Sequence, residues 1–151
     1  MFLKRFALGT VVGCLFLFFI GWVVNDLFLE DFLQQYAGLT PSAQRSETLT
    51  YYALWGNLFA GCVLSYLLTR LRINSSLAAV VVGWMFGFCF KAAALMQVYA
   101  TTTVYSKTGI LVETFVYSVI TAVAAMGIYM VVDLANVSAV GDTEMSEIEL
   151  K

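Results

Sequence analysis

Four continuous apolar runs, separated by shorter polar stretches, dominate the chain. They cover residues 6–24, 51–68, 77–98 and 110–132, and the third continues in a more polar form to Tyr105. As a helix rising about 1.5 Å per residue, each run is long enough to cross roughly 30 Å of hydrocarbon. Because the runs are continuous rather than alternating, and every backbone group in lipid needs a partner, they predict helices. The predicted fold is all-α, a four-transmembrane-helix bundle.

The longest polar stretch lies between the first two runs and begins "NDLFLEDFLQQYAGL" at residue 25. Its apolar side chains recur every three or four positions, at Leu29, Phe32, Leu33 and Tyr36. This spacing predicts a short interfacial helix between helices one and two. A simple extension of the first helix is the alternative. The predicted domains are a transmembrane domain over residues 1–132 and an acidic cytoplasmic tail over residues 133–151.

The composition agrees with membrane insertion and argues against several kinds of ligand. Of the 151 residues, 61% are hydrophobic and 12% charged, against about 45–50% and 25% in soluble domains. Histidine is absent, and the three cysteines lie within apolar runs without a CxxC pair, so we expect no metal and no cofactor. The net charge of −2 includes no basic block, which argues against nucleic acid as a partner.

The basic residues predict an orientation. Arginine and lysine are enriched in cytoplasmic loops near the ends of membrane helices. One side of the predicted bundle carries more of them than the other, which places both termini in the cytoplasm of a multi-pass cell-membrane protein. The basic residues of the richer side are Lys4, Arg5, Arg70, Arg72 and Lys151, against Arg45 and Lys107 on the other side.

Each predicted helix also offers a narrow face of small residues. Such faces let helices approach closely in lipid, where apolar attraction between helices is weak. They favour a compact bundle and leave open whether some of them serve a homo-oligomer or another membrane protein. The small residues are Gly9 and Gly13 in helix one, Gly61 and Ser65 in helix two, Gly83 and Gly87 in helix three, and Thr114, Ser118, Ala122 and Ala125 in helix four.

Lys91 lies within the third apolar run, where a charge costs roughly 3 kcal/mol. Because it follows Gly83 and Gly87 at intervals of four, it shares their helix face and should point into the bundle. Glu113, on the next helix, is its best candidate partner. These two residues centre a candidate ligand- or ion-binding cluster that opens outward. The other members of the predicted cluster are Asp26, Asn57 and Gln97. A structural ion pair and a lysine that is neutral in the membrane, with a lowered pKa, are the alternatives.

Two segments, "GTVVGCLFLFFIGWVVNDLFLEDF" from Gly9 and "NLFAGCVLSYLLTR" from Asn57, precede a glycine-rich third helix. This pattern resembles small four-helix bacterial membrane proteins of unknown function. The resemblance covers most of residues 3–132 and implies a membrane bundle, with no functional residue to carry over. Small multidrug exporters have four helices in a similar length, but they carry an essential acidic residue within the first helix. Here the first helix is uncharged until Asp26, at its outer end.

Three functions are therefore considered. The first is a structural or accessory membrane protein that binds itself or another membrane protein. The second is a small transporter or channel using the outer polar cluster around Lys91 and Glu113. An enzyme comes last, because the chain lacks histidine and shows no nucleophile beside these two residues.

Overall fold

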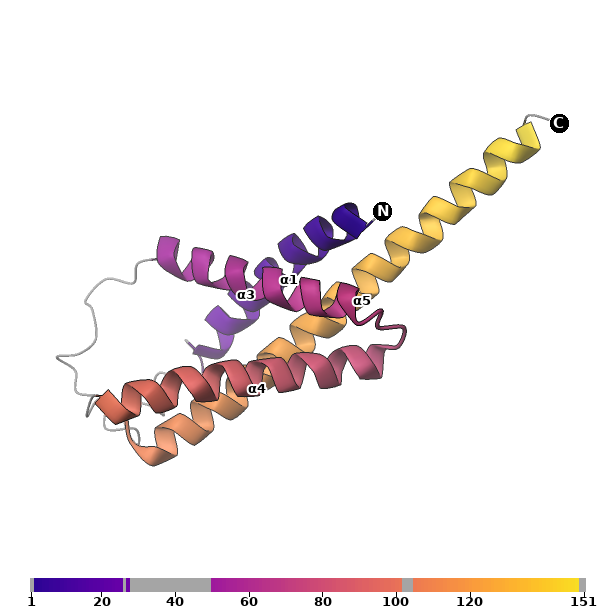
Figure 1. Cartoon of the computed structure of the whole chain (residues 1–151). Coiled ribbons are helices and arrows are strands. Elements are labelled where there is room, and N and C mark those ends of the chain that lie inside the picture. Colours follow the sequence, from indigo (N-terminus) through magenta and orange to yellow (C-terminus); the bar gives the residue numbers. More distant parts are fainter. Residues whose placement is uncertain (1, 26, 28–49, 102–104, 150–151) are drawn as a thin grey trace.

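The structure of the chain is a computed structural model that describes residues 2–25, 27, 50–101 and 105–149; for residues 2, 50 and 133–149 it describes the backbone alone. Within these ranges the chain forms α1 (Phe2–Val24), α3 (Thr50–Arg70), α4 (Ser76–Thr101) and α5 (Lys107–Glu149), and no strand (Figure 1). The predicted all-helical class is confirmed. The predicted interfacial helix falls outside the described residues.

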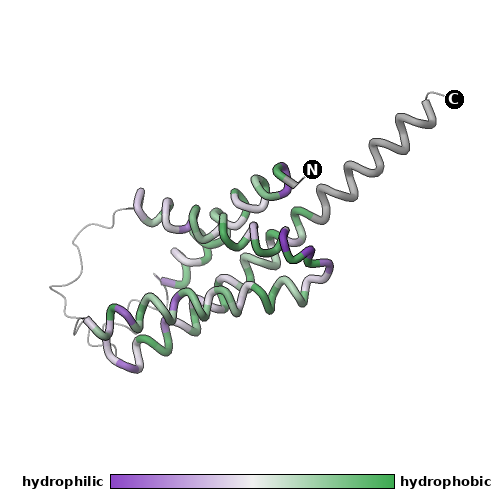
Figure 2. The backbone as a smooth tube through the Cα atoms, in the orientation of Figure 1, coloured by the Kyte–Doolittle hydropathy of each residue, from purple (hydrophilic) through white to green (hydrophobic). Residues whose placement is uncertain are grey.

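The described residues contain four segments that are long and apolar enough to cross a membrane: Leu3–Val24, Tyr51–Arg70, Ser76–Thr101 and Lys107–Val132. They coincide with the four apolar runs of the sequence to within a few residues. Figure 2 shows hydrophobic residues along the bodies of the helices and hydrophilic ones gathered near their ends and connections. Helix α5 alone continues beyond its apolar part, to Glu149.

Serine side chains set the starts of α4 and α5. The Ala78 amide donates to Ser75 Oγ at 3.2 Å, and the Gly109 amide donates to Ser106 Oγ at 3.1 Å. In each case the serine precedes the helix and accepts from the third helical residue, which is the usual N-cap geometry. These caps fix where both helices begin.

The helices pack side by side in the order α3–α1–α5–α4. Helix α4 packs mainly on α5, and α1 packs on both α3 and α5, whereas α3 makes few contacts with α4 or α5. Consecutive helices run antiparallel, so α1 begins at the end of the bundle where α3 ends and α4 starts (Figure 1). Helices α3 and α4 therefore form the two outer walls of the bundle.

Small residues lie where the helices approach most closely. A Cβ added at Gly61 of α3 would lie 2.8 Å from the Cys14 nitrogen of α1, and one at Gly83 of α4 would lie 2.6 Å from the Thr121 carbonyl oxygen of α5. Gly13 and Gly9 of α1 likewise face Ile128 of α5. The predicted small stripe of α5 is buried throughout: Thr114, Ser118, Ala122 and Ala125.

Several buried hydroxyl groups donate hydrogen bonds to helix carbonyls. Ser65 Oγ on α3 donates to the Phe6 carbonyl oxygen of α1 at 3.0 Å, which ties these two helices together. Ser118 Oγ donates to the Thr114 carbonyl within α5 at 2.6 Å. Such bonds remove the cost of burying a hydroxyl in an apolar environment.

Candidate functional site

An ion pair joins α4 to α5. Lys91 Nζ lies 2.6 Å from Glu113 Oε1, and the two side chains are 26% and 12% exposed. The contact that the sequence predicted between these two residues is present. Because the charges are opposite and adjacent, the pair is neutral as a unit and much easier to hold in a low-dielectric environment than either charge alone.

The antiparallel register of α4 and α5 places the two charges opposite one another. Gly83 meets Ala122 and Ala125, and Gly87, one turn later, meets Ser118 and Thr121. One further turn along α4 brings Lys91 to the level of Glu113. The two glycines thus bring the helix backbones close together just before the position of the charged pair.

Lys91 has a second partner on α5. Its Nζ lies over the ring of Tyr117, 5.4 Å from the ring centroid, within the distance at which a cation and an aromatic face attract. Tyr117 follows Glu113 by one helical turn, so the ammonium group contacts two successive turns of α5. This arrangement restrains both the position and the direction of the lysine side chain.

The Glu113 carboxylate is only partly satisfied. Its Oε1 carries the ion pair, whereas Oε2 is buried and has no hydrogen-bond partner among the described residues. Buried carboxylate oxygens are normally paired. An open lone pair beside a lysine could accept a proton, a water or a cation, and this is the chemistry that the arrangement offers.

Tyr105, in the connection between α4 and α5, responds to this carboxylate. Burial raises the pKa of Tyr105 to about 12, with further contributions from the negative charge of Glu113 and hydrogen bonding toward its carboxylate. The Tyr105 hydroxyl lies near enough to Glu113 for the carboxylate to raise the pKa of the tyrosine. The hydroxyl does not form a hydrogen bond with Glu113 Oε2. Tyr105 therefore belongs to the surroundings of the pair, and the sequence analysis did not single it out.

The other predicted site residues that the structure describes make no hydrogen bond or ion pair with Lys91 or Glu113. Gln97 is exposed on α4, and Asn57 is half-buried on α3 with no hydrogen bond to either charged residue. Asp26 falls outside the described residues. Of the predicted cluster, the described structure brings together Lys91 and Glu113. Among the described residues no three Cys, Asp or Glu side chains gather in a way that could hold a metal ion.

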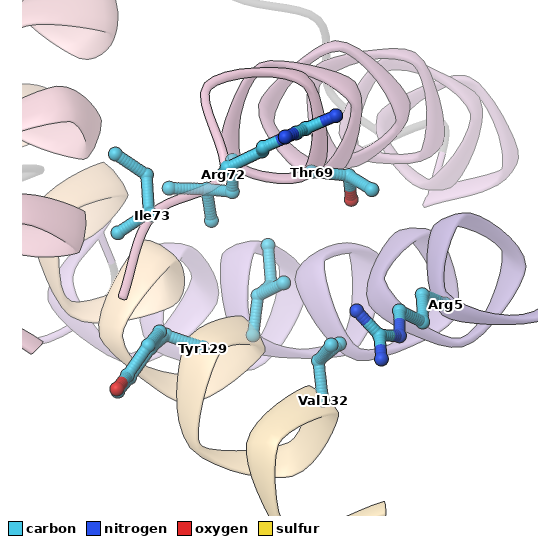
Figure 3. A pocket seen from close by; sticks show the side chains of 8 residues that line it. Arg5, Thr69, Arg72, Ile73, Tyr129 and Val132 are labelled. Carbon is cyan, nitrogen blue, oxygen red and sulfur yellow. The ribbon is translucent and has the colours of Figure 1, made fainter. Parts of the chain in front are cut away.

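A cavity lies at the opposite end of the bundle, where α1 begins and α3 ends. It has a volume of about 90 Å³ and is lined by Arg5, Leu68, Thr69, Arg72, Ile73, Ile128, Tyr129 and Val132 (Figure 3). From the sequence, both arginines were interpreted only as orientation signals. Their positions at matching ends of neighbouring antiparallel segments were the available indication that they could share a site.

Comparison with known proteins adds no relative. No family model matches the chain, and neither a curated protein nor a solved structure shows significant similarity to it. The resemblance to small four-helix bacterial membrane proteins stays a prediction.

Proposed function

We propose that this chain is a small multi-pass integral membrane protein with a structural or accessory role. It crosses the cell membrane four times with both termini in the cytoplasm, and it associates with itself or with another membrane protein. The Lys91–Glu113 pair holds α4 and α5 in register within the membrane.

The outward-facing apolar surface supports insertion into lipid. Large apolar side chains project from the bundle on every helix, among them Val11, Phe59, Met85 and Phe115, at 54%, 66%, 56% and 58% exposure. Water-soluble monomers rarely expose continuous apolar surface on this scale. In a bilayer the same surface meets hydrocarbon or the helix of another protein at little cost.

The ion pair is the observation that carries the structural role. Both charged groups contact each other at 2.6 Å, and Lys91 also contacts Tyr117, so the principal interactions of the lysine are made within the chain. The close glycine contacts are likewise made within the chain, between α1 and α3 and between α4 and α5. What remains for a partner is the outer wall of the bundle, above all α3 and α4.

A row of exposed aromatic side chains lies on the α3 wall. Trp55 lies between Tyr51 and Phe59, with ring centroids 6.0 and 6.1 Å away, and all three side chains are exposed. Tyr66, two turns further along, is exposed as well. Aromatic residues are enriched at the contact surfaces of proteins and at the membrane interface. This wall is the surface through which we expect association.

The mass of the native particle tests this role. The full-length protein is extracted from its native membrane in mild detergent, and the protein mass of the particle is measured by light scattering. We expect a mass above the 16.7 kDa of one chain, from additional copies or from a stoichiometric partner, and a reduced mass for Trp55→Ala. A clean monomer in the native extract would contradict the proposed association.

A small transporter or channel is the second candidate, favoured by the unpartnered Glu113 Oε2. In this case purified protein in liposomes should carry an ion or proton flux that Glu113→Gln abolishes. Gln97→Ala is the matched control, because Gln97 is also polar but is exposed on α4 and takes no part in the ion pair. Absence of flux in the unmodified protein, or equal loss in both variants, would count against a transport site at Glu113.

A further inference from the structure

The cavity at the end of the bundle combines an apolar wall with a basic rim. Leu68, Ile73, Ile128 and Val132 supply the apolar wall, from α3, the turn after it and α5. Arg5 of α1 and Arg72 of the turn supply the charges, and the hydroxyl-bearing side chains of Thr69 and Tyr129 complete the lining (Figure 3). Since a water needs roughly 10–15 Å³ of such space, a cavity of about 90 Å³ admits several waters or a small polar group.

The backbone at the end of α3 fixes the position of Arg72. The Ile73 amide donates to the Leu68 carbonyl oxygen at 3.3 Å, and the Arg72 amide donates to the Thr69 carbonyl oxygen at 3.4 Å. These two bonds form a Schellman motif, in which the residue after the helix adopts a left-handed conformation and is usually glycine. Here that residue is Arg72, with φ at 50°, so an arginine occupies a position where its side chain is a steric cost.

An arginine at such a position points to a use for its side chain, because backbone strain of this kind is concentrated at functional sites. Arg72 is exposed, whereas Ile73 packs against the buried core that includes Leu68, and both of these apolar residues line the cavity. The same turn therefore builds the wall of the cavity and presents a cation at its rim.

Arg5 contributes the second guanidinium from the first turns of α1. It is half-buried, and the amino-terminal end of a helix carries a partial positive charge that favours anions. Arg5 has interactions of its own, but a guanidinium group has five N–H donors and is always charged, so it can bind an anion as well. Lys4 and Arg70, both exposed nearby in sequence, add to the positive charge of this end.

We propose that this cavity binds the phosphate group of an anionic phospholipid in the cytoplasmic leaflet. Arg72 and Arg5 bind the phosphate oxygens, since the planar guanidinium matches phosphate in geometry and charge. The apolar wall receives the first part of an acyl chain. Free phosphate would leave this wall uncovered. Basic pockets between membrane helices at the cytoplasmic surface recognise headgroups of this kind. The proposal rests on the membrane insertion argued above.

Titration of lipid onto the full-length protein tests the site. The protein is purified in mild detergent, and bound lipid is counted by native mass spectrometry with phosphatidylglycerol or zwitterionic phosphatidylcholine as the probe. We expect phosphatidylglycerol to bind more tightly than phosphatidylcholine. Arg72→Gln should lower its affinity about tenfold, the effect of losing a charge-assisted hydrogen bond.

Two further variants separate the site from general charge and from misfolding. Arg70→Gln removes the same charge from the same segment but not from the cavity lining, so it should lower affinity by at most about twofold, in line with a screened surface charge. Arg72→Gly should raise thermal stability without lipid, because glycine suits the left-handed position, and should lose lipid binding as Arg72→Gln does.

Equal losses for Arg70→Gln and Arg72→Gln would overturn the site, because they would indicate attraction by the basic surface as a whole. Displacement of the lipid by inorganic phosphate at an equal concentration would overturn the lipid as ligand. Neither of these two outcomes bears on membrane insertion. Insertion is tested separately, by whether alkaline carbonate releases the protein from native membranes.

Discussion

At the scale of the residue, two glycines on α3 have opposite surroundings. A Cβ added at Gly61 would lie 2.8 Å from the Cys14 backbone nitrogen and 3.1 Å from the Thr10 carbonyl oxygen, whereas one added at Gly56 meets nothing within 4 Å. Backbone atoms cannot move aside as the end of a flexible side chain can. Gly61 is thus required by the α1–α3 contact, and Gly56 is not.

Alanine should lower the stability of the protein at Gly61 but not at Gly56. Gly61→Ala forces α1 and α3 apart and should lower the free energy of unfolding by about 2 kcal/mol, within the range of overpacking effects. Gly56→Ala, the matched control, should leave stability unchanged or raise it by about 0.5–1 kcal/mol, because alanine suits a helix better than glycine. Thermal unfolding in lipid nanodiscs, followed by circular dichroism, measures both. Equal effects would be inconsistent with the close contact at Gly61.

A second prediction at this scale concerns the Lys91–Glu113 pair. Either Lys91→Met or Glu113→Gln leaves one charge without its partner in the interior and should cost about 2 kcal/mol, between typical values for exposed and buried pairs. The double variant removes both charges, so its cost should be clearly smaller than the sum of the two single costs. Strictly additive costs in the same nanodisc unfolding assay would show that the pair contributes no coupling.

At the scale of the element, the α4–α5 hairpin combines a capped start, a glycine contact face and the charged pair. Ser106 caps α5, Gly83 and Gly87 bring α4 against it, and Lys91 then meets Glu113. Tyr105 lies in the connection immediately before the cap. Because its titration depends on Glu113, it reports on whether the hairpin is formed.

The pKa of Tyr105 predicts a pH dependence. The value rises from 10.0 to about 12 in the folded chain, so between these values the folded chain keeps a proton that the unfolded chain releases. The contribution of this group to stability is therefore complete below about pH 10 and is lost as the pH rises toward 12.

The difference in tyrosinate absorbance between the unmodified protein and Tyr105→Phe isolates this titration, and its midpoint should lie near pH 12. In Glu113→Gln the midpoint should fall but stay above 10, because the contributions of the carboxylate are lost while burial, the largest cause of the raised pKa, remains. A midpoint near 10 in both proteins would contradict the placement of Tyr105 beside Glu113.

Much of the fold follows from the sequence, because the signals that define it are local. The four apolar runs predict the four helices, and the interval of four between Gly83, Gly87 and Lys91 predicts which face of α4 is buried. The short connection to the next helix makes Glu113 the partner of Lys91. Each of these inferences uses residues close in sequence or helices that are consecutive.

Other features depend on which helices become neighbours, and sequence spacing does not encode this. The cavity joins Arg5 of α1, Arg72 of the α3–α4 turn and Tyr129 of α5, and it exists because α1 lies between α3 and α5. The left-handed conformation of Arg72 was not expected from the sequence, because arginine does not favour it. For the same reason, its presence is informative. The helical continuation of α5 to Glu149 could not be predicted, because this segment has no apolar pattern.

At the scale of the whole molecule, the two ends of the bundle differ in their number of basic residues. The end where α1 begins and α3 ends carries Lys4, Arg5, Arg70 and Arg72, whereas the described part of the other end has Lys107. The side walls between the two ends are apolar (Figure 2). This distribution is what a four-span protein needs if its basic end faces the cytoplasm.

Labelling of single cysteines in intact cells tests the four-span arrangement most directly. With the three native cysteines changed to alanine, Asn74→Cys places one exposed thiol in the turn before α4, and Thr108→Cys places another in the first turn of α5. A membrane-impermeant maleimide should label Thr108→Cys in intact cells and Asn74→Cys only after the membrane is permeabilised. Labelling of both thiols in intact cells, or of Asn74→Cys alone, would contradict a bundle that spans the membrane with its basic end in the cytoplasm.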